Sequence, residues 1–150
     1  VAKLFHIVPA DTAYFGQKDY QQAQILTRMA EDLNFPIQVR VLPTFREDDG
    51  LAMSSRNAYL TPAQRQDATV LHQALVRARE MIVDEREGSS AKVIEEMKRI
   101  VKKAKGSKVD YIAVSHTETL EDVREIRGRV LVALAVHLGK ARLIDNDLIP

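Results

Sequence analysis

The first 42 residues alternate between short β-prone runs and one amphipathic helix, and this order constrains the fold more than any other feature of the sequence. Residues 12–15 form a short apolar run, residues 18–33 have helical periodicity, and residues 37–41 alternate in the manner of a strand. This spacing predicts a βαβ unit with parallel strands. The expected core stripe of its helix is Ile25, Met29 and Leu33. Residues 1–8 are interpreted as the end of a helix already under way, so we expect the chain to be part of a longer protein.

The second part of the sequence predicts two helices followed by about three strands. A polar loop, 43–56, comes first, and Thr61 with Gln64 then forms a capping-box pattern that starts a helix ending near Gly88. A second helix is expected over residues 91–105. The expected inward-facing side chains are Leu71, Leu75, Ala78, Ile82, Val93, Ile94, Met97, Ile100 and Val101. The expected strands cover residues 109–114, 129–137 and 141–144. This order predicts a small α+β domain that begins near residues 43–46.

The charges of the chain are nearly balanced, with 22 Lys and Arg against 21 Asp and Glu and a net charge of +1. This balance gives no broad electrostatic reason to bind nucleic acid or a membrane surface, so we expect neither as a partner. The chain has no cysteine, which excludes disulfides, thiolate catalysis and zinc sites that need cysteine. No apolar run reaches the roughly 18 residues of a membrane helix, and we expect a cytoplasmic protein.

The first candidate site is the segment 15–22, Phe-Gly-Gln-Lys-Asp-Tyr-Gln-Gln, where the first strand meets its helix. Open α/β sheets bind ligands at this point, and Gly16 allows the backbone to approach a ligand closely. Lys18 lies where the helix dipole disfavours a cation, which indicates a negative partner such as a phosphate. Gln22 lies one turn later on the same helix face. The alternative is a solvated lysine in an ordinary turn.

The second candidate site is the segment 50–57, Gly-Leu-Ala-Met-Ser-Ser-Arg-Asn. The hydroxyls of Ser54 and Ser55 can donate hydrogen bonds to phosphate oxygens, and the guanidinium of Arg56 can bind two oxygens at once. The alternative is a surface loop in which Ser54 or Ser55 caps a turn. The preceding acidic pair, 48–49, is interpreted as a solvated turn rather than a metal site.

Together these segments resemble the signature motifs of the pantothenate synthetase (pantoate–β-alanine ligase) family. Residues 16–22 are similar to the family pattern G-[EQ]-K-D-[FY]-Q-Q, and residues 50–57 match the end of D-G-L-A-M-S-S-R-N. Residues 143–146 are similar to the end of the R-L-I-D-N strand of the family. The resemblance spans the whole chain and corresponds to the C-terminal portion of the family.

The resemblance implies an α/β fold with two parts. Residues 1–45 would be the incomplete C-terminal part of a Rossmann-like nucleotide-binding domain, and residues 46–150 would be a small α+β C-terminal domain that carries the Met-Ser-Ser-Arg loop. The implied activity is the ATP-dependent ligation of pantoate to β-alanine, with Mg²⁺ as cofactor. Pantoyl adenylate and pyrophosphate form first, and β-alanine then releases pantothenate and AMP. Full-length members of the family are typically homodimers.

The resemblance also implies roles for individual residues. The implied catalytic residues are Lys18, Ser54, Ser55 and Arg56. The implied ATP-binding residues are Gly16, Gln17, Lys18, Asp19, Phe45, Met53, Ser54, Ser55 and Arg56. Gln22 would bind pantoate, and no residue is assigned to a metal. Phe45 stands where valine is frequent in the family, and Pro9 is shifted from the position usual there.

The family's H-x-G-H nucleotide motif does not occur in this chain, and the four histidines are scattered. We expect no catalytic role for His6, His72, His116 or His137, with His72 on a helix surface. We therefore expect the chain alone to make no pantothenate. Two other classes remain open from the residues: an adenylate-forming enzyme for another small carboxylic acid, and a non-catalytic interaction domain.

Overall fold

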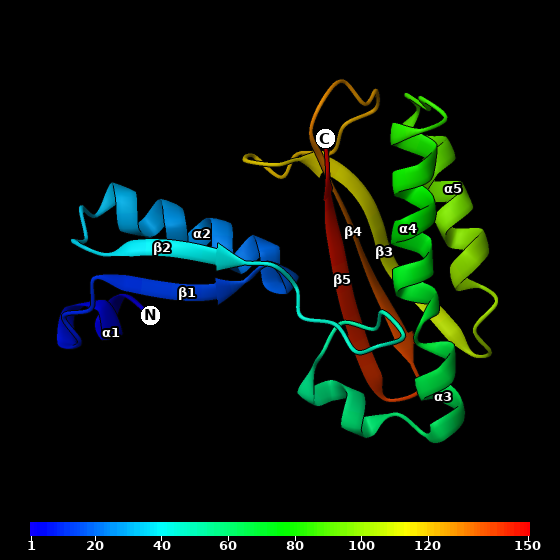
Figure 1. The fold of residues 1–150 in the computed structure, drawn as a ribbon, viewed down its shortest axis with the longest axis horizontal. Coiled ribbons are helices and arrows are strands. Elements are labelled where there is room, and N and C mark those ends of the chain that lie inside the picture. The colour runs from blue at the N-terminus through cyan, green and yellow to red at the C-terminus, as the bar shows by residue number, and fades with distance from the viewer. The chain divides into compact units, whose positions relative to one another are not determined.

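The computed structural model of the protein describes residues 1–150, and the chain divides into two compact units, Val1–Phe45 and Arg46–Pro150 (Figure 1). Unit 1 contains two parallel strands and unit 2 contains three antiparallel strands. The predicted α/β class, with a small α+β part after the βαβ unit, is confirmed.

Unit 1 is the predicted βαβ arrangement. Its elements are α1 (Ala2–Ile7), β1 (Thr12–Gly16), the 3₁₀ helix η1 (Gln17–Asp19), α2 (Tyr20–Asp32) and β2 (Gln38–Leu42). The strands pair in parallel, from Thr12 opposite Gln38 to Gly16 opposite Leu42. The strand pair and the helix between them therefore place the carboxyl end of β1 directly before η1 and α2.

The predicted core stripe of α2 is wrong. Ile25 is 58% exposed and Leu33 is 60% exposed in the described chain. The buried side chains of this helix are Tyr20, Ala23, Leu26 and Ala30. Successive helix residues are rotated by about 100°, so the face that contains Leu26 is turned away from the face that contains Ile25. The prediction selected the face with the larger apolar side chains. The buried face was overlooked because two of its four residues are alanines.

Unit 2 packs two helices against an antiparallel sheet. Its elements are the 3₁₀ helix η2 (Ser55–Tyr59), α3 (Pro62–Asp67), α4 (Val70–Val83), α5 (Ser90–Val101), β3 (Ser107–His116), β4 (Val130–Leu138) and β5 (Ala141–Ile149). The strand order is β3-β4-β5, and Figure 1 shows α4 and α5 side by side against the sheet. The central strand β4 is buried along nearly its whole length, as its continuous apolar run predicts.

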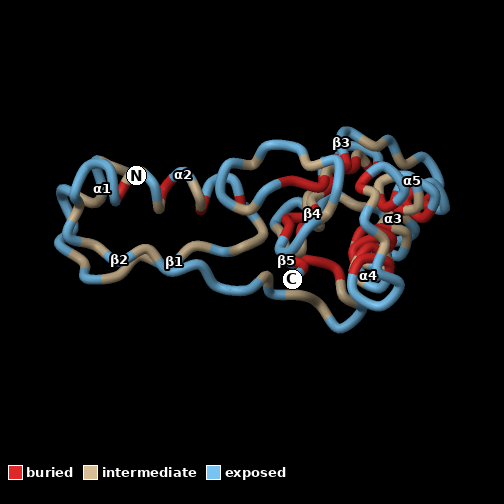
Figure 2. Tube along the Cα trace, turned by 90° about the horizontal axis from the view of Figure 1, so that it is seen from above, coloured by how far each residue is buried: buried red, intermediate tan, exposed pale blue.

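The core of unit 2 forms between the helices and the sheet, where the buried residues concentrate (Figure 2). The predicted inward-facing side chains of both helices lie in this core, with Ile94 partly buried at its edge. Fully buried side chains from all layers include Leu75, Val93, Met97, Leu134 and Val136. Because unit 2 contributes most of the buried apolar surface, this core is expected to dominate the stability of the chain.

The predicted helix over residues 61–87 is two helices. The capping box of Thr61 and Gln64 is present at the start of α3, as predicted. The helix breaks before Val70, because the Thr69 hydroxyl donates to the carbonyl of Gln66 at 2.9 Å and competes with the regular helix pattern.

The predicted ends of three other elements shift. Helix α4 ends at Val83, and the left-handed residue after it is Arg86 rather than Gly88. Helix α5 ends at Val101, four residues before the predicted end. Strand β5 continues to Ile149, because the polar residues 145–147 remain in register with β4.

Candidate functional site

The predicted site residues fall into two groups, one in each unit. Gly16, Lys18 and Gln22 belong to unit 1, and the segment 53–56 belongs to unit 2. The predicted roles of both groups in binding phosphate therefore stay predictions.

In unit 1 the structure places the Gly-Gln-Lys-Asp segment at the carboxyl end of β1, as the sequence predicts. Gly16 ends the strand, and a Cβ added to it would meet no atom within 4 Å, so the space beside its backbone is open. Lys18 lies in η1 rather than in the first turn of the α-helix, which begins at Tyr20. Asp19 and Gln22 are exposed, and Gln17 and Lys18 are half-buried.

Phe45 is the last residue of unit 1, and its side chain is 75% exposed. The side chain makes no ring contact with another residue. Its predicted contact with the nucleotide stays a prediction.

In unit 2 the residues before the exposed segment form a compact turn, 46–52. The Glu47 amide donates to the carbonyl of Leu51 at 2.9 Å, and the Gly50 amide donates to the carbonyl of Glu47 at 2.8 Å. Gly50 has a φ of 90°, a left-handed value that favours glycine. Leu51 and Ala52 are buried in unit 2. The 46–52 turn is therefore closed by its own backbone hydrogen bonds and anchored to the core by the side chain of Leu51.

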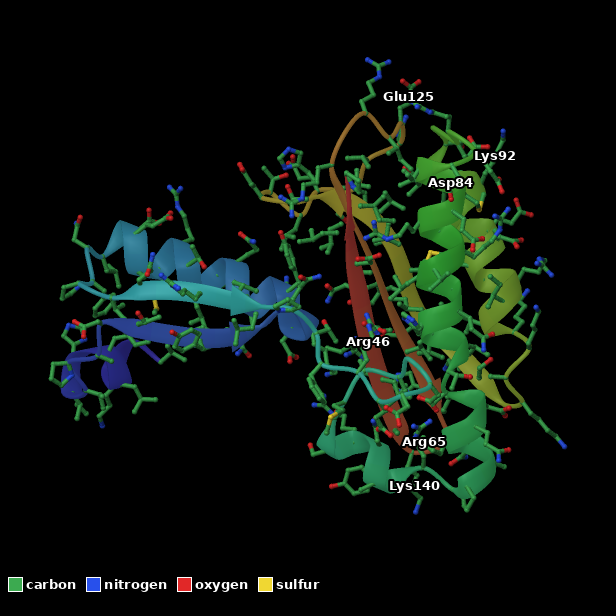
Figure 3. All side chains as sticks on the ribbon, in the orientation of Figure 1. Arg46, Arg65, Asp84, Lys92, Glu125 and Lys140 are labelled. Carbon is green, nitrogen blue, oxygen red and sulfur yellow. The ribbon has the colours of Figure 1, made fainter.

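An ion pair joins the 46–52 turn to the last strand. The guanidinium of Arg46, which is labelled in Figure 3, binds both carboxylate oxygens of Asp145, at 2.6 and 3.0 Å. It also donates to the carbonyl of Gly50 at 3.0 Å. The Asp145 side chain is 1% exposed and the Arg46 side chain is 24% exposed. The sequence analysis matched residues 143–146 to a family motif but predicted no structural role for them. In the structure, Asp145 binds Arg46 and so fixes the turn.

A second arginine holds the acidic side of the same turn. Arg65 on α3, which is labelled in Figure 3, donates to Asp49 and to Glu47, both at 2.6 Å. The hydrogen bonds from Arg65 lower the pKa of Glu47 and of Asp49 below their ordinary values. Asn57 also donates to Glu47, at 3.0 Å. Asp48 and Asp49 are both exposed, as the prediction of a solvated acidic turn expects, and Asp49 is in addition bound by Arg65.

The segment that follows the turn is exposed. Met53 is half exposed, and Ser55 and Arg56 are exposed, at the start of η2. The Ser54 hydroxyl accepts a hydrogen bond from the Arg56 amide at 3.2 Å, so Ser54 caps η2, as the alternative interpretation expected. The arginines on either side, Arg46 and Arg65, bind carboxylates, whereas the Arg56 guanidinium has no carboxylate within ion-pair distance. Arg56 is thus the cation of this region that an external anion can reach.

The prediction that His72 lies on a helix surface is wrong. The residue is half-buried on α4, and its Nδ1 is buried without a hydrogen-bond partner. Burial lowers the pKa of His72, and the nearby charge of Arg46 lowers it further. Its position, next to the core residue Leu71 on the helix, is the sequence signal that could have indicated partial burial.

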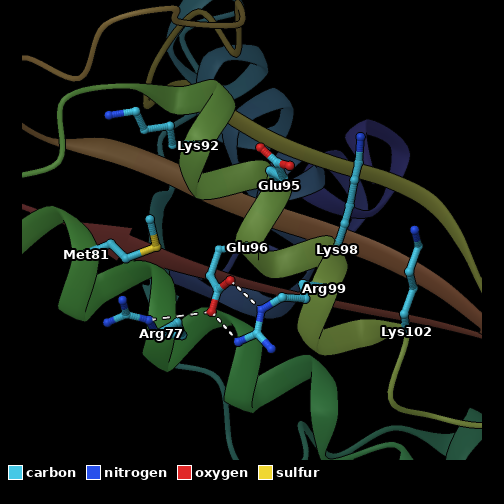
Figure 4. A pocket seen from close by; sticks show the side chains of 8 residues that line it. All are labelled: Arg77, Met81, Lys92, Glu95, Glu96, Lys98, Arg99 and Lys102. Atoms are coloured by element: carbon cyan, nitrogen blue, oxygen red, sulfur yellow. Dashed lines mark hydrogen bonds and ion pairs between the residues drawn. The ribbon is translucent and has the colours of Figure 1, made fainter.

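A groove of about 570 Å³ lies between α4 and α5, and no predicted site residue lines it (Figure 4). Its charged lining is largely paired, since Glu96 binds Arg99 at 2.7 Å and Arg77 at 3.8 Å. The groove lacks the hydroxyls and the glycine-containing turn of the segment 50–57, so it is not the candidate site.

The structure has no group of three or more histidine or carboxylate side chains that could hold a metal ion. No helix of the structure combines the length and the apolar character that a membrane crossing needs.

Comparisons with known proteins agree with the motifs. The sequence model of the Pantoate-beta-alanine ligase family matches residues 1–148. A pantothenate synthetase of Moorella thermoacetica is 52% identical over 147 residues, which are 97% of this chain and 51% of that protein. One of Desulfitobacterium hafniense is 47% identical over 149 residues, which are 99% of this chain and 52% of that protein.

Solved structures give the same result. The crystal structure of a pantothenate synthetase from Thermus thermophilus has a TM-score of 0.90 at 41% identity, and the match covers 97% of this chain and 52% of that one. A pantoate–β-alanine ligase from Francisella tularensis, in a complex with β,γ ATP and β-alanine, has a TM-score of 0.67 at 27% identity, with 98% and 47% covered. The chain thus spans about half the length of the curated relatives that it matches.

Proposed function

Because the chain belongs to the pantoate–β-alanine ligase family, we propose that it supplies part of the active site of an enzyme that joins pantoate to β-alanine with ATP. The observation that carries this proposal is the 46–52 turn, which is anchored by Arg46 and Arg65 and is followed by the exposed residues Met53, Ser55 and Arg56. A rigid turn followed by exposed donors suits the binding of a polyphosphate, since preorganised donors lose little entropy when the ligand binds.

In the proposed first step, a carboxylate oxygen of pantoate attacks the α-phosphorus of ATP, and the bond to the β-phosphate oxygen breaks. Pyrophosphate leaves, and negative charge increases around the α-phosphate in the transition state. Lys18 and Arg56 would stabilise that charge, and Ser54 and Ser55 would donate hydrogen bonds to phosphate oxygens. The pantoate carboxylate is already a nucleophile, so this step needs no general base.

In the proposed second step, the amine of β-alanine attacks the acyl carbon of pantoyl adenylate. The carbon–oxygen bond to AMP breaks, the amine loses a proton, and pantothenate and AMP are released. Gln22, exposed one turn after Lys18, would hydrogen-bond pantoate and orient it for both steps. Gly16, Gln17, Asp19, Phe45 and Met53 would complete the nucleotide contacts.

Mg²⁺ would reach such a site with the triphosphate, because this ion usually binds through phosphate oxygens, water and one or two carboxylates. Asp19 is an exposed carboxylate in the Gly-Gln-Lys-Asp segment and fits that donor set. The ion would neutralise part of the phosphate charge. A cytoplasmic location and a homodimeric full-length enzyme are parts of the same proposal.

Isothermal titration of the chain with ATP and Mg²⁺ tests the proposal. We expect Lys18→Ala and Arg56→Ala each to weaken binding by roughly 10- to 150-fold, since a hydrogen bond to a charged group contributes about 1.5–3 kcal/mol. The matched controls are Lys98→Ala and Arg124→Ala, which remove exposed cations of unit 2 that form no ion pair. The controls are expected to bind as the unmodified chain does.

Equal losses in the controls, or no heat with ATP at millimolar concentration, would contradict nucleotide binding by these residues. Release of AMP from ATP, pantoate and β-alanine is the second measurement. We expect the chain alone to release little, since it contains no H-x-G-H motif. Binding of ATP without a preference for pantoate over other small carboxylic acids would favour a different adenylate-forming enzyme.

A further inference from the structure

The ring of His72 lies directly against the 46–52 turn. A Cβ built on Gly50 would lie 2.1 Å from Cδ2 of His72, 2.8 Å from its Nε2 and 2.9 Å from its Cγ. The imidazole therefore occupies the space that any side chain at position 50 would need. His72 belongs to helix α4 and is half-buried.

The surroundings of the ring favour its neutral form. The Nδ1 atom is buried without a hydrogen-bond partner, so a proton there would have no acceptor. Four charged groups act on the ring: Arg46 disfavours a second positive charge, and Asp145, Asp147 and Asp49 favour it. Each of these three carboxylates is already bound by an arginine. Arg46 binds Asp145, Arg65 binds Asp49, and Arg79 binds Asp147 at 2.8 Å.

The same ring thus touches the backbone of the turn and lies near the ion pair that anchors it. Arg46 reaches the turn through the carbonyl of Gly50, the residue against which His72 packs. A positive charge on His72 would repel Arg46 and weaken both contacts at once. The segment 53–56 follows the turn directly, so its position depends on these contacts.

We propose that His72 is a positioning residue for the phosphate-binding segment 53–56, and that the turn is held in place only while its imidazole is neutral. The role in binding rests on the proposed function, whereas the role in holding the turn does not. No contact of His72 with substrate is part of the proposal. The ring acts through Gly50 and Arg46.

Amide hydrogen exchange of Glu47 and Gly50 tests the proposal without ligand, because both amides donate within the turn. Opening constants, corrected for the intrinsic exchange rate, are measured between about pH 7.5 and about pH 5, the range in which histidine titrates. Burial lowers the pKa of His72, so the imidazole of the folded chain becomes protonated at a lower pH than its ordinary pKa of 6.5. We expect the turn to open more as the pH falls below that value.

Two variants separate shape from charge. His72→Phe keeps a ring against Gly50 but accepts no proton, so the opening constants should stay low and lose their increase at acidic pH. His72→Ala removes the ring, so the opening constants should rise by roughly tenfold or more at every pH, a factor that corresponds to about 1.4 kcal/mol. His137→Phe on β4 is the matched control, and it should keep the pH profile of the unmodified chain.

The affinity for ATP and Mg²⁺ is then measured for the same variants at both ends of the pH range. We expect it to fall at acidic pH in the unmodified chain and to stay constant in His72→Phe. Absence of ATP binding in every variant would contradict the proposed function. The amide exchange data would still show whether the neutral His72 ring holds the turn in place. Opening constants that are independent of pH in the unmodified chain, or unchanged in His72→Ala, would overturn the inference.

Discussion

Replacing Arg46 with alanine tests the anchor of the 46–52 turn most directly. The substitution removes both hydrogen bonds to Asp145 and the hydrogen bond to the carbonyl of Gly50. The Asp145 carboxylate, 1% exposed, then keeps the hydrogen bond from the amide of Asn146 at 2.8 Å but has lost its cation. Loss of one partner of a buried ion pair costs about 3–5 kcal/mol, because the remaining charge is buried without compensation.

We expect the low end of that range, about 3 kcal/mol, because Arg46 is 24% exposed and water can enter the space that it leaves. Urea unfolding of unit 2, followed by circular dichroism, measures the change. With a slope of about 1.5 kcal/mol per molar urea, the midpoint should fall by about 2 M.

Two further variants make the test decisive. Arg142→Ala breaks an ion pair with Asp110 in which the side chains are 45% and 41% exposed, so we expect a loss of at most about 1 kcal/mol. The double variant Arg46→Met/Asp145→Leu removes both charges and should recover much of the loss. A change in Arg46→Ala no larger than that in Arg142→Ala would refute the reasoning, because the Asp145 carboxylate would then be solvated.

Three other substitutions test the turn and the core. Gly50→Ala combines a left-handed φ of 90° with a Cβ that would lie 2.1 Å from a ring atom, so unfolding midpoints should show a loss of roughly 2 kcal/mol or more. Arg65→Gln removes the donor that lowers the pKa of Glu47 and Asp49, so both should return toward their ordinary values of 4.5 and 3.8 in an NMR titration. Because a lowered folded pKa gives stability that is lost as the pH falls, this variant should also lose less stability on acidification. Leu134→Ala, at a position with no exposure, should cost about 2–5 kcal/mol of unfolding free energy.

Local patterns predicted most of the fold. Strand pairing in unit 1 followed from the βαβ spacing, and the capping box at Thr61 followed from local side-chain chemistry. The core faces of α4 and α5 followed from helical periodicity because their apolar stripes are wide. These features depend on residues that lie close together in the sequence, where periodicity and capping rules are informative.

Features that depend on contacts between distant residues were missed. Strand β5 was predicted to end at residue 144, where its apolar run ends, whereas the structure continues the strand through polar residues that bind Arg46 and Arg79. The burial of His72 depends on a turn more than twenty residues earlier in the chain. Periodicity carries no information on such pairs. The site residues themselves were found through motif resemblance, and their roles stay predictions.

The ion pair between Arg46 and Asp145 also separates two kinds of mutation, those that alter the fold of the loop and those that alter only its exposed side chains. The side chains of Met53, Ser55 and Arg56 form no hydrogen bond or ion pair, so a library randomised at these positions should retain folded members at high frequency. Asp145 is 99 positions away from Arg46 in the sequence, yet its replacement should disturb the same loop. Substitutions at the three exposed residues should therefore weaken nucleotide binding and leave the fold intact, whereas substitution of the distant aspartate should disturb the fold of the loop.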